Sequence, residues 1–157
     1  MRKKVLLIAF VLVALVAMSA SANTFGIGGA FSIDALGGLP SNAMLSVKFP
    51  QTPVLWGIGA QLNQDTFNLA MTADWWLYTQ NLVGFVNLYV GPGLYLSLPD
   101  RIEFGGRVPI GLNAYPIPVL ELFLEIAPTL LFFSNQGIQI PSFGLQGAFG
   151  FRFWFNV

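Results

Sequence analysis

The sequence predicts an all-β protein, an eight-stranded antiparallel up-and-down transmembrane β-barrel preceded by a cleaved signal peptide. Three observations predict it. The chain begins with an export leader, apolar and polar residues then alternate with a period of two, and charged residues fall on one of the two alternating faces. Alternation with this period is typical of strands, because successive side chains point to opposite faces of a sheet.

The first 22 residues have the organisation of a secretory signal peptide. Three basic residues follow Met1, an apolar run extends from Val5 to Met18, and small residues follow it up to Ala22. This order predicts export and cleavage near Ala22. An uncleaved anchor helix is the alternative, and it is disfavoured because no basic residue follows the run to stop transfer. The exported chain is then a single barrel domain, residues 23–157.

Composition excludes several classes of function. Only 9% of the residues are charged, whereas a water-facing surface carries about 25–35%. The chain has no cysteine and no histidine, which excludes disulfides, thiolate catalysis, Ser-His-Asp triads and the usual metal ligands. The exported chain has no basic patch of the kind that binds nucleic acid. We therefore expect no enzyme activity, no cofactor and no metal.

Eight stretches of alternation predict eight strands, separated by short connections rich in Gly, Pro, Asn and Asp. The predicted strands are 24–34, 42–49, 54–63, 66–76, 82–97, 101–113, 118–133 and 141–157. The predicted connections are 35–41, 50–53, 63–65, 78–81, 98–100, 114–117 and 134–140. Pro92, Pro109 and Pro128 fall inside strands, where each removes one ladder hydrogen bond, so we expect bulges or earlier strand ends there.

The charged residues of the predicted strands share one face. That face also carries the glycines and amides, and its charges are Asp34, Lys48, Asp74, Glu103, Arg107, Glu121, Glu125 and Arg152. The remaining three charges, Asp65, Asp100 and Arg101, fall at connections. None falls on the apolar face. The two faces therefore meet different surroundings.

Size indicates which face is inside. An eight-stranded barrel has an interior just wide enough for side chains to fill. The apolar face carries most of the large Phe, Leu, Ile and Val side chains, too much bulk for that space, whereas the face with glycine, alanine and a few charges fits. We therefore expect the apolar face to contact lipid. The alternative is a soluble, lipocalin-like carrier with an apolar interior.

The last predicted strand resembles the C-terminus of small outer-membrane β-barrels of the OmpA transmembrane-domain and OmpX type. Gly150, Phe153 and Phe155 occupy the glycine and aromatic positions of that family's insertion signal, although Ala148 stands at its polar position and two residues follow the last aromatic. The resemblance implies outer-membrane lipid and the barrel-assembly machinery as partners. It also implies periplasmic termini in a diderm bacterium, with connections 35–41, 63–65, 98–100 and 134–140 facing outward.

A second, shorter resemblance involves the sixth and seventh predicted strands. The stretch Gly106-Arg107-Val108-Pro109-Ile110-Gly111, followed by Glu121, Glu125 and Pro128, is similar to OmpA-like barrels of spirochaetes. Nothing in this stretch adds a ligand or a partner to the first resemblance. We expect a monomer.

Charges inside a barrel need partners, because an unpaired buried charge destabilises the fold. A turn centred near Pro116 would bring Arg107 opposite Glu125, and a loop centred near Gly137 would bring Arg152 opposite Glu121. We expect these four residues, with Glu103, Lys48 and Asp74, to form a charge lattice across the lumen. It would be a structural plug, or alternatively a gate.

Two carboxylates on one strand raise the question of acid–base catalysis. Glu121 and Glu125 lie roughly 13 Å apart along a strand, beyond the ~5–9.5 Å of glycosidase pairs. We therefore expect a structural or surface-exposed outer-membrane barrel with a filled polar lumen. A narrow channel for ions or small solutes, gated by Arg/Glu pairs, and the soluble carrier are the alternatives.

Overall fold

The computed structural model describes residues 24–36, 42–49, 52–62, 67–100, 102–135 and 141–156. These residues form eleven strands: β1 (Thr24–Leu36), β2 (Asn42–Lys48), β3 (Val54–Leu62), β4 (Phe67–Trp75), β5 (Tyr78–Val83), β6 (Val86–Val90), β7 (Gly93–Pro99), β8 (Glu103–Arg107), β9 (Ile110–Ile117), β10 (Leu120–Ser134) and β11 (Ser142–Asn156). Within them, no helix is long and apolar enough to cross a membrane.

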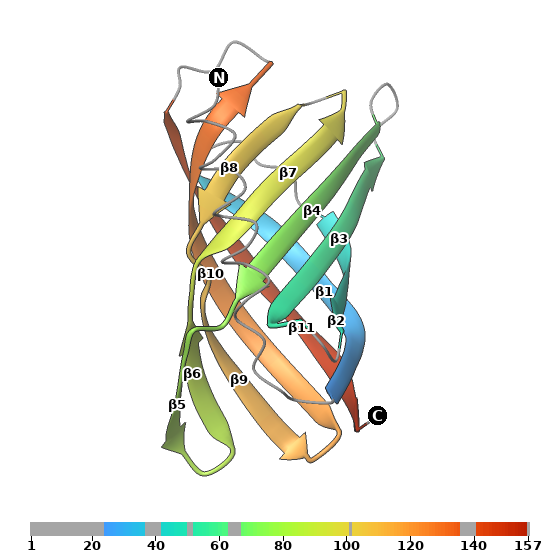
Figure 1. Cartoon of the computed structure of the whole chain (residues 1–157), viewed down its shortest axis with the longest axis vertical. Helices are drawn as coiled ribbons and strands as arrows, with labels where there is room; N and C mark the ends of the chain where they lie inside the picture. Colours follow the sequence, from blue (N-terminus) through green and yellow to red (C-terminus); the bar gives the residue numbers. More distant parts are fainter. Residues whose placement is uncertain are drawn as a thin grey trace.

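The strands close into an antiparallel barrel (Figure 1). The ring runs β11-β1-β2-β3-β4-β7-β8-β10 and closes where β10 pairs with β11. Below this ring, β5 pairs with β6, β6 with β9, and β9 with β10. Thus β5, β6 and β9 continue β4, β7 and β8 toward the end of the barrel that holds the start of β1 and the end of β11. The predicted count of eight strands is confirmed, with three of them interrupted.

Prolines lie at two of the three interruptions, and the third, at Trp76-Leu77, contains none. Pro92 separates β6 from β7, and Pro109 separates β8 from β9. The ladder continues across these breaks, because the backbone N–H groups of Trp75, Gly91 and Val108 donate to the carbonyls of Pro92, Pro109 and Pro128, respectively. The expectation of a strand break is confirmed at Pro92 and Pro109. It is wrong at Pro128, since β10 runs through that residue and pairs with β11 there.

Two predicted connections are wrong. Residues 78–81 lie in β5 and residues 114–117 lie in β9, so the turns fall later, at Gly84-Phe85 and at Pro118-Val119. Gly84 has a φ of 53°, the left-handed conformation that glycine adopts without strain. Asn81 looks like a turn residue in the sequence, but its side chain donates to Asn87 across the β5–β6 pair.

The two faces of the barrel wall differ as predicted. Large apolar side chains cover the outside, with Leu124, Phe149 and Leu122 among those that are exposed. Six charged side chains of the described strands are buried inside: Asp74, Glu103, Arg107, Glu121, Glu125 and Arg152. Some predictions fall outside the described residues: the leader, the cleavage near Ala22, the charges Asp65 and Arg101, and the side chain of Asp34.

Candidate functional site: the charged interior of the barrel

The barrel interior holds two arginines, each surrounded by hydrogen-bonding groups from several strands. Arg152 lies on β11 and Arg107 at the end of β8. Both side chains are almost completely buried. Because strand residues alternate between the two faces, every second residue of β4, β8, β10 and β11 projects toward these guanidinium groups.

Glu121 and Arg152 form the first cluster. They are direct cross-strand partners in the β10–β11 pair, and Arg152 Nη1 lies 2.8 Å from Glu121 Oε1. Arg152 Nε donates to Ser46 Oγ, also at 2.8 Å, and the guanidinium carbon lies 3.8 Å from the centre of the Phe123 ring. A planar cation is therefore held by a carboxylate, a hydroxyl and an aromatic face.

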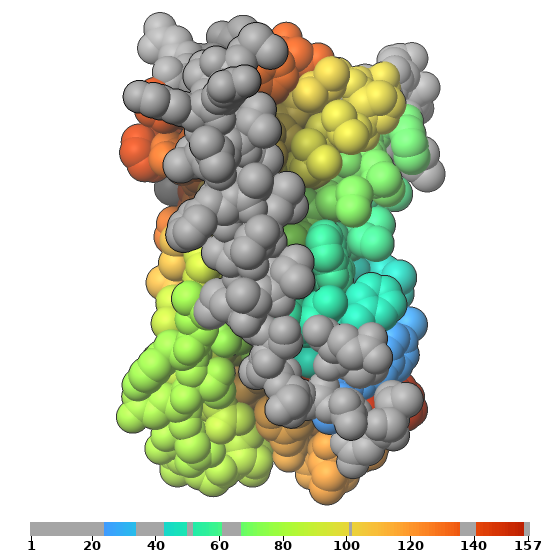
Figure 2. All heavy atoms as spheres, viewed as in Figure 1, coloured from blue at the N-terminus to red at the C-terminus, as the bar shows by residue number. Residues whose placement is uncertain are grey.

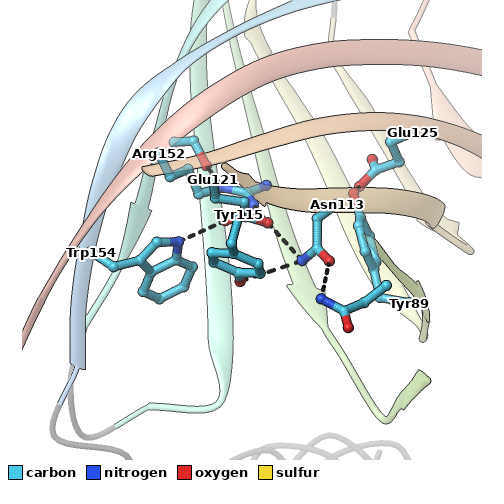
Figure 3. A network of polar contacts seen from close by, with 9 residues as sticks. Tyr89, Asn113, Tyr115, Glu121, Glu125, Arg152 and Trp154 are labelled. Atoms are coloured by element: carbon cyan, nitrogen blue, oxygen red, sulfur yellow. Dashed lines mark hydrogen bonds and ion pairs between the residues drawn. The ribbon is translucent and has the colours of Figure 1, made fainter. Parts of the chain in front are cut away.

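The Glu121 carboxylate accepts from three side chains. Asn113 Nδ2 and Arg152 Nη1 each donate to Oε1, and Trp154 Nε1 donates to Oε2, all at 2.8 Å (Figure 3). Glu121 has no solvent exposure. Since a buried carboxylate needs donors on both oxygens, this cluster satisfies its one negative charge fully.

Beyond Glu121, a row of amides continues across the inner wall. Asn113 accepts a hydrogen bond from Asn87 at 3.2 Å, and Asn87 accepts one from Asn81 at 2.9 Å. This row links β5, β6, β9 and β10 in one chain of hydrogen bonds that ends on the carboxylate. The polar interior of the barrel is therefore a connected network at this end.

Arg107 holds the second cluster and contacts two carboxylates. Its Nη2 pairs with Glu125 Oε1, and its Nε lies 3.2 Å from Asp74 Oδ1. Nη1 donates to Gln146 Oε1 at 2.9 Å. Tyr89 donates its hydroxyl to the other oxygen of Glu125 at 2.8 Å. Here two carboxylates share one guanidinium.

Glycines on the inner wall make room for this second cluster. A Cβ at Gly93 would overlap the Asp74 carboxylate and approach Arg107 Cγ to 2.9 Å. A Cβ at Gly111 would overlap the Tyr89 ring. By contrast, Gly29 on the outer face has no neighbouring atom closer than 3.6 Å. The inward glycines therefore act as space for neighbouring side chains.

A small space remains beside the two arginines. A cavity of about 30 Å³ lies between the arginines and the small residues of β1 to β3, which is room for one or two water molecules. On the other side of Arg107, Ala70, Tyr95 and Leu131 pack into a buried apolar cluster. An ion crossing the barrel would meet both the charged clusters and this apolar layer.

The structure brings together five of the seven predicted lattice residues: Asp74, Arg107, Glu121, Glu125 and Arg152. The predicted register of one pair is wrong, because Arg107 lies opposite Thr129 and Glu125 lies opposite Gly111. The turn falls later than Pro116, and the long arginine side chain spans the difference.

The other predicted residues lie apart from the two clusters. Glu103 is fully buried in β8 opposite Ser97. Lys48 lies at the end of β2, with its ammonium 5.9 Å from the centre of the Trp154 ring. In the predicted insertion signal, Phe153 and Phe155 are exposed on the outer face, and Gly150 lies close to the backbone of Gly29 and Ala30.

Sequence reasoning missed the neutral members of the site. Tyr89, Asn113, Gln146, Trp154 and Ser46 all bind the charged groups, yet each resembles an ordinary strand residue. Their position on the same face as the charges is the signal that would have indicated them, because a buried ion pair needs further hydrogen bonds to its remaining atoms. Among the described residues, no group of three or more acidic side chains is arranged to hold a metal ion.

Comparison with known proteins gives a single likeness to report. No protein-family model matches the chain, and no curated protein matches it. Among solved structures, the chain is similar to Neisserial surface protein A (NspA), with 12% sequence identity and a TM-score of 0.42. The likeness covers 85% of this chain and 95% of that one.

Proposed function

We propose that this protein is an integral β-barrel of the bacterial outer membrane, with a closed lumen and a structural or surface role. The observation that carries the proposal is the inverted distribution of side chains. Large apolar residues are exposed along the outer wall, as on β10 and β11, and buried ion pairs lie inside. A soluble protein buries the first kind and exposes the second.

The strands have the dimensions that a membrane requires. On β10, outward apolar residues extend from Leu122 to Phe132, which matches the roughly 9–11 residues of a membrane-spanning strand. Because the ring is closed, the backbone N–H and C=O groups of neighbouring strands pair with each other, as a lipid environment requires. The interior counts against a lipocalin-like carrier, because its described lining carries buried ion pairs in place of an apolar surface.

Solubility and gel mobility test the membrane assignment. We expect the exported chain to require detergent for solubility after refolding. We also expect unheated samples to migrate differently from boiled ones, because the closed barrel resists unfolding by detergent. A folded protein that stays soluble without detergent would contradict the assignment and favour the carrier.

A narrow channel is the second candidate, and the alternative charge partners of Arg107 favour it. This guanidinium contacts both Asp74 and Glu125, so it has two carboxylates between which to exchange. Conductance of the refolded protein across planar bilayers separates the candidates. Silence supports the closed barrel, whereas discrete current steps that disappear in Arg107→Ala or Glu125→Ala would establish the gate.

A further inference from the structure

Two hairpin turns at one end of the barrel are apolar where turns normally are polar. The β5–β6 turn carries Leu82, Val83 and Phe85, and the β9–β10 turn carries Ile117 and Val119. All five side chains are exposed, Val83 by 71% and Phe85 by 60%. We call these five residues the apolar rim. Turns in water instead favour Gly, Asn, Asp and Ser.

The apolar rim forms the tips of the molecule at this end. In Figure 2 the β5–β6 hairpin projects at the lower left and the β9–β10 hairpin at the bottom. The segments that form the two hairpin ends, residues 78–86 and 115–120, contain no charged residue. The opposite end differs, because Asp100 and Asn135 lie in its connections and accept from the backbone N–H groups of Phe67 and Ile102.

Several backbone carbonyls at both apolar turns have donors within the chain. Asn81 Nδ2 lies 2.9 Å from the carbonyl oxygen of Gly84 and 3.3 Å from that of Val86. The N–H of Tyr115 donates to the Phe85 carbonyl, and that of Trp154 donates to the Val119 carbonyl. Donors from the chain itself therefore reach carbonyls at both hairpin ends.

The β9–β10 turn also carries few backbone donors. Pro116 and Pro118 have no N–H group. On the outer side of β5, the Tyr78 hydroxyl donates to Gln80 Oε1 at 2.6 Å, so these two polar groups also satisfy each other. Apolar side chains, few backbone donors and carbonyls with donors from the chain all lower the cost for a segment of leaving water.

We propose that the apolar rim is immersed in the lipid, at the boundary between the headgroups and the acyl chains. The lipid-facing surface then extends down to the hairpin tips, since Val86 and Leu120 connect the apolar rim to the apolar outer wall. The inference rests on the proposed membrane function. It adds that the barrel end formed by the β5–β6 and β9–β10 hairpins is buried in the membrane surface, while Asp100 and Asn135 at the other end reach water.

Single-cysteine labelling tests this proposal, because the chain has no cysteine of its own. Val83→Cys and Val119→Cys report on the apolar rim, Leu124→Cys on the outer wall, and Pro141→Cys on the opposite end. Each variant carries an environment-sensitive fluorophore and is refolded into phosphatidylcholine vesicles. Quenching by spin-labelled lipid and by aqueous iodide is then compared.

We expect the labels at Val83 and Val119 to emit at shorter wavelength than the label at Pro141. Spin-labelled lipid should quench them, as it quenches the label at Leu124, and iodide should not. Quenching by iodide at both rim sites would overturn the proposal. Protection from both quenchers would also overturn it, because it would indicate a second copy of the chain on the rim. Iodide quenching at Leu124 as well would instead contradict the membrane assignment.

A charge substitution provides an independent measurement. We expect Val83→Asp to fold in detergent micelles as the wild type does, since the position is exposed, and to lose insertion into vesicles. The matched control is Pro141→Asp, which should insert normally. Insertion of Val83→Asp at the wild-type yield would overturn the proposal.

Discussion

The two arginine clusters inside the barrel differ in charge balance and in the way they are built. Arg152 pairs with one carboxylate, Glu121, that lies directly opposite it on the neighbouring strand. Arg107 contacts two carboxylates, Asp74 and Glu125, and reaches the second across several residues of strand register. The first cluster has one carboxylate for one guanidinium, whereas the second has two.

This difference shows that burial alone does not determine how a charge contributes to stability. In the first cluster each charge depends on a single opposite charge. In the second, removing one carboxylate leaves Arg107 paired, but removing Arg107 leaves two carboxylates close together. Loss of the arginine should therefore destabilise the Arg107 cluster more, whereas loss of a carboxylate should destabilise the Arg152 cluster more.

The largest expected effect comes from removing the arginines. Arg107→Met leaves two buried carboxylates unpaired, and Arg152→Met leaves one. Breaking a buried pair costs about 3–5 kcal/mol of unfolding free energy, and we expect Arg107→Met to fall at or beyond the upper end. Urea unfolding of the barrel refolded in vesicles measures both losses. A smaller loss for Arg107→Met than for Arg152→Met would contradict the comparison.

Removing a carboxylate should reverse the order. Glu121→Gln leaves Arg152 without a negative partner and should cost about 3 kcal/mol. Asp74→Asn leaves Arg107 with Glu125 and relieves repulsion between the two acids, so we expect a loss of about 1 kcal/mol or less. Both substitutions keep the side-chain shape, and the same urea titration compares them. Equal losses of unfolding free energy would mean that the second carboxylate beside Arg107 makes no difference.

A substitution that adds volume beside the second cluster tests how tightly that cluster is packed. Gly93→Ala places a methyl group where the Asp74 carboxylate lies, and overpacking of this kind costs about 1–3 kcal/mol. We expect a loss near 2 kcal/mol. Gly29→Ala is the matched control, since its nearest neighbouring atom is 3.6 Å away, and its stability should stay close to that of the wild type. A stable Gly93→Ala protein would show that Asp74 moves freely.

A neutral partner provides a further test of the second cluster. Tyr89→Phe removes the hydroxyl that donates to Glu125, and a hydrogen bond to a charged group contributes about 1.5–3 kcal/mol. We expect the lower end, about 1.5 kcal/mol, because Arg107 still holds the carboxylate. Combining Tyr89→Phe with Asp74→Asn would show a coupling energy if the two act on one network. If the two losses of unfolding free energy simply add, Tyr89 acts independently of the contact between Asp74 and Arg107.

The sequence alone determined the strand count, the two faces and the identity of the buried charges. Alternation with a period of two places every charge of a strand on one face, and few positions along this chain break that period. The same pattern predicted the contact between Glu121 and Arg152, since both residues lie on adjacent strands joined by one loop. Even the interruptions at Pro92 and Pro109 follow from the chemistry of proline.

The tertiary structure alone decided register, turn position and the neutral partners. Asn81 and Tyr115 look like turn residues, yet both lie in strands, where Asn81 donates to Asn87 and the Tyr115 N–H donates to the Phe85 carbonyl of the neighbouring hairpin. A shift of the β9–β10 turn moves Arg107 opposite Thr129, and only side-chain reach restores its contact with Glu125. Such contacts depend on how strands from distant parts of the chain align, which local residue patterns do not encode.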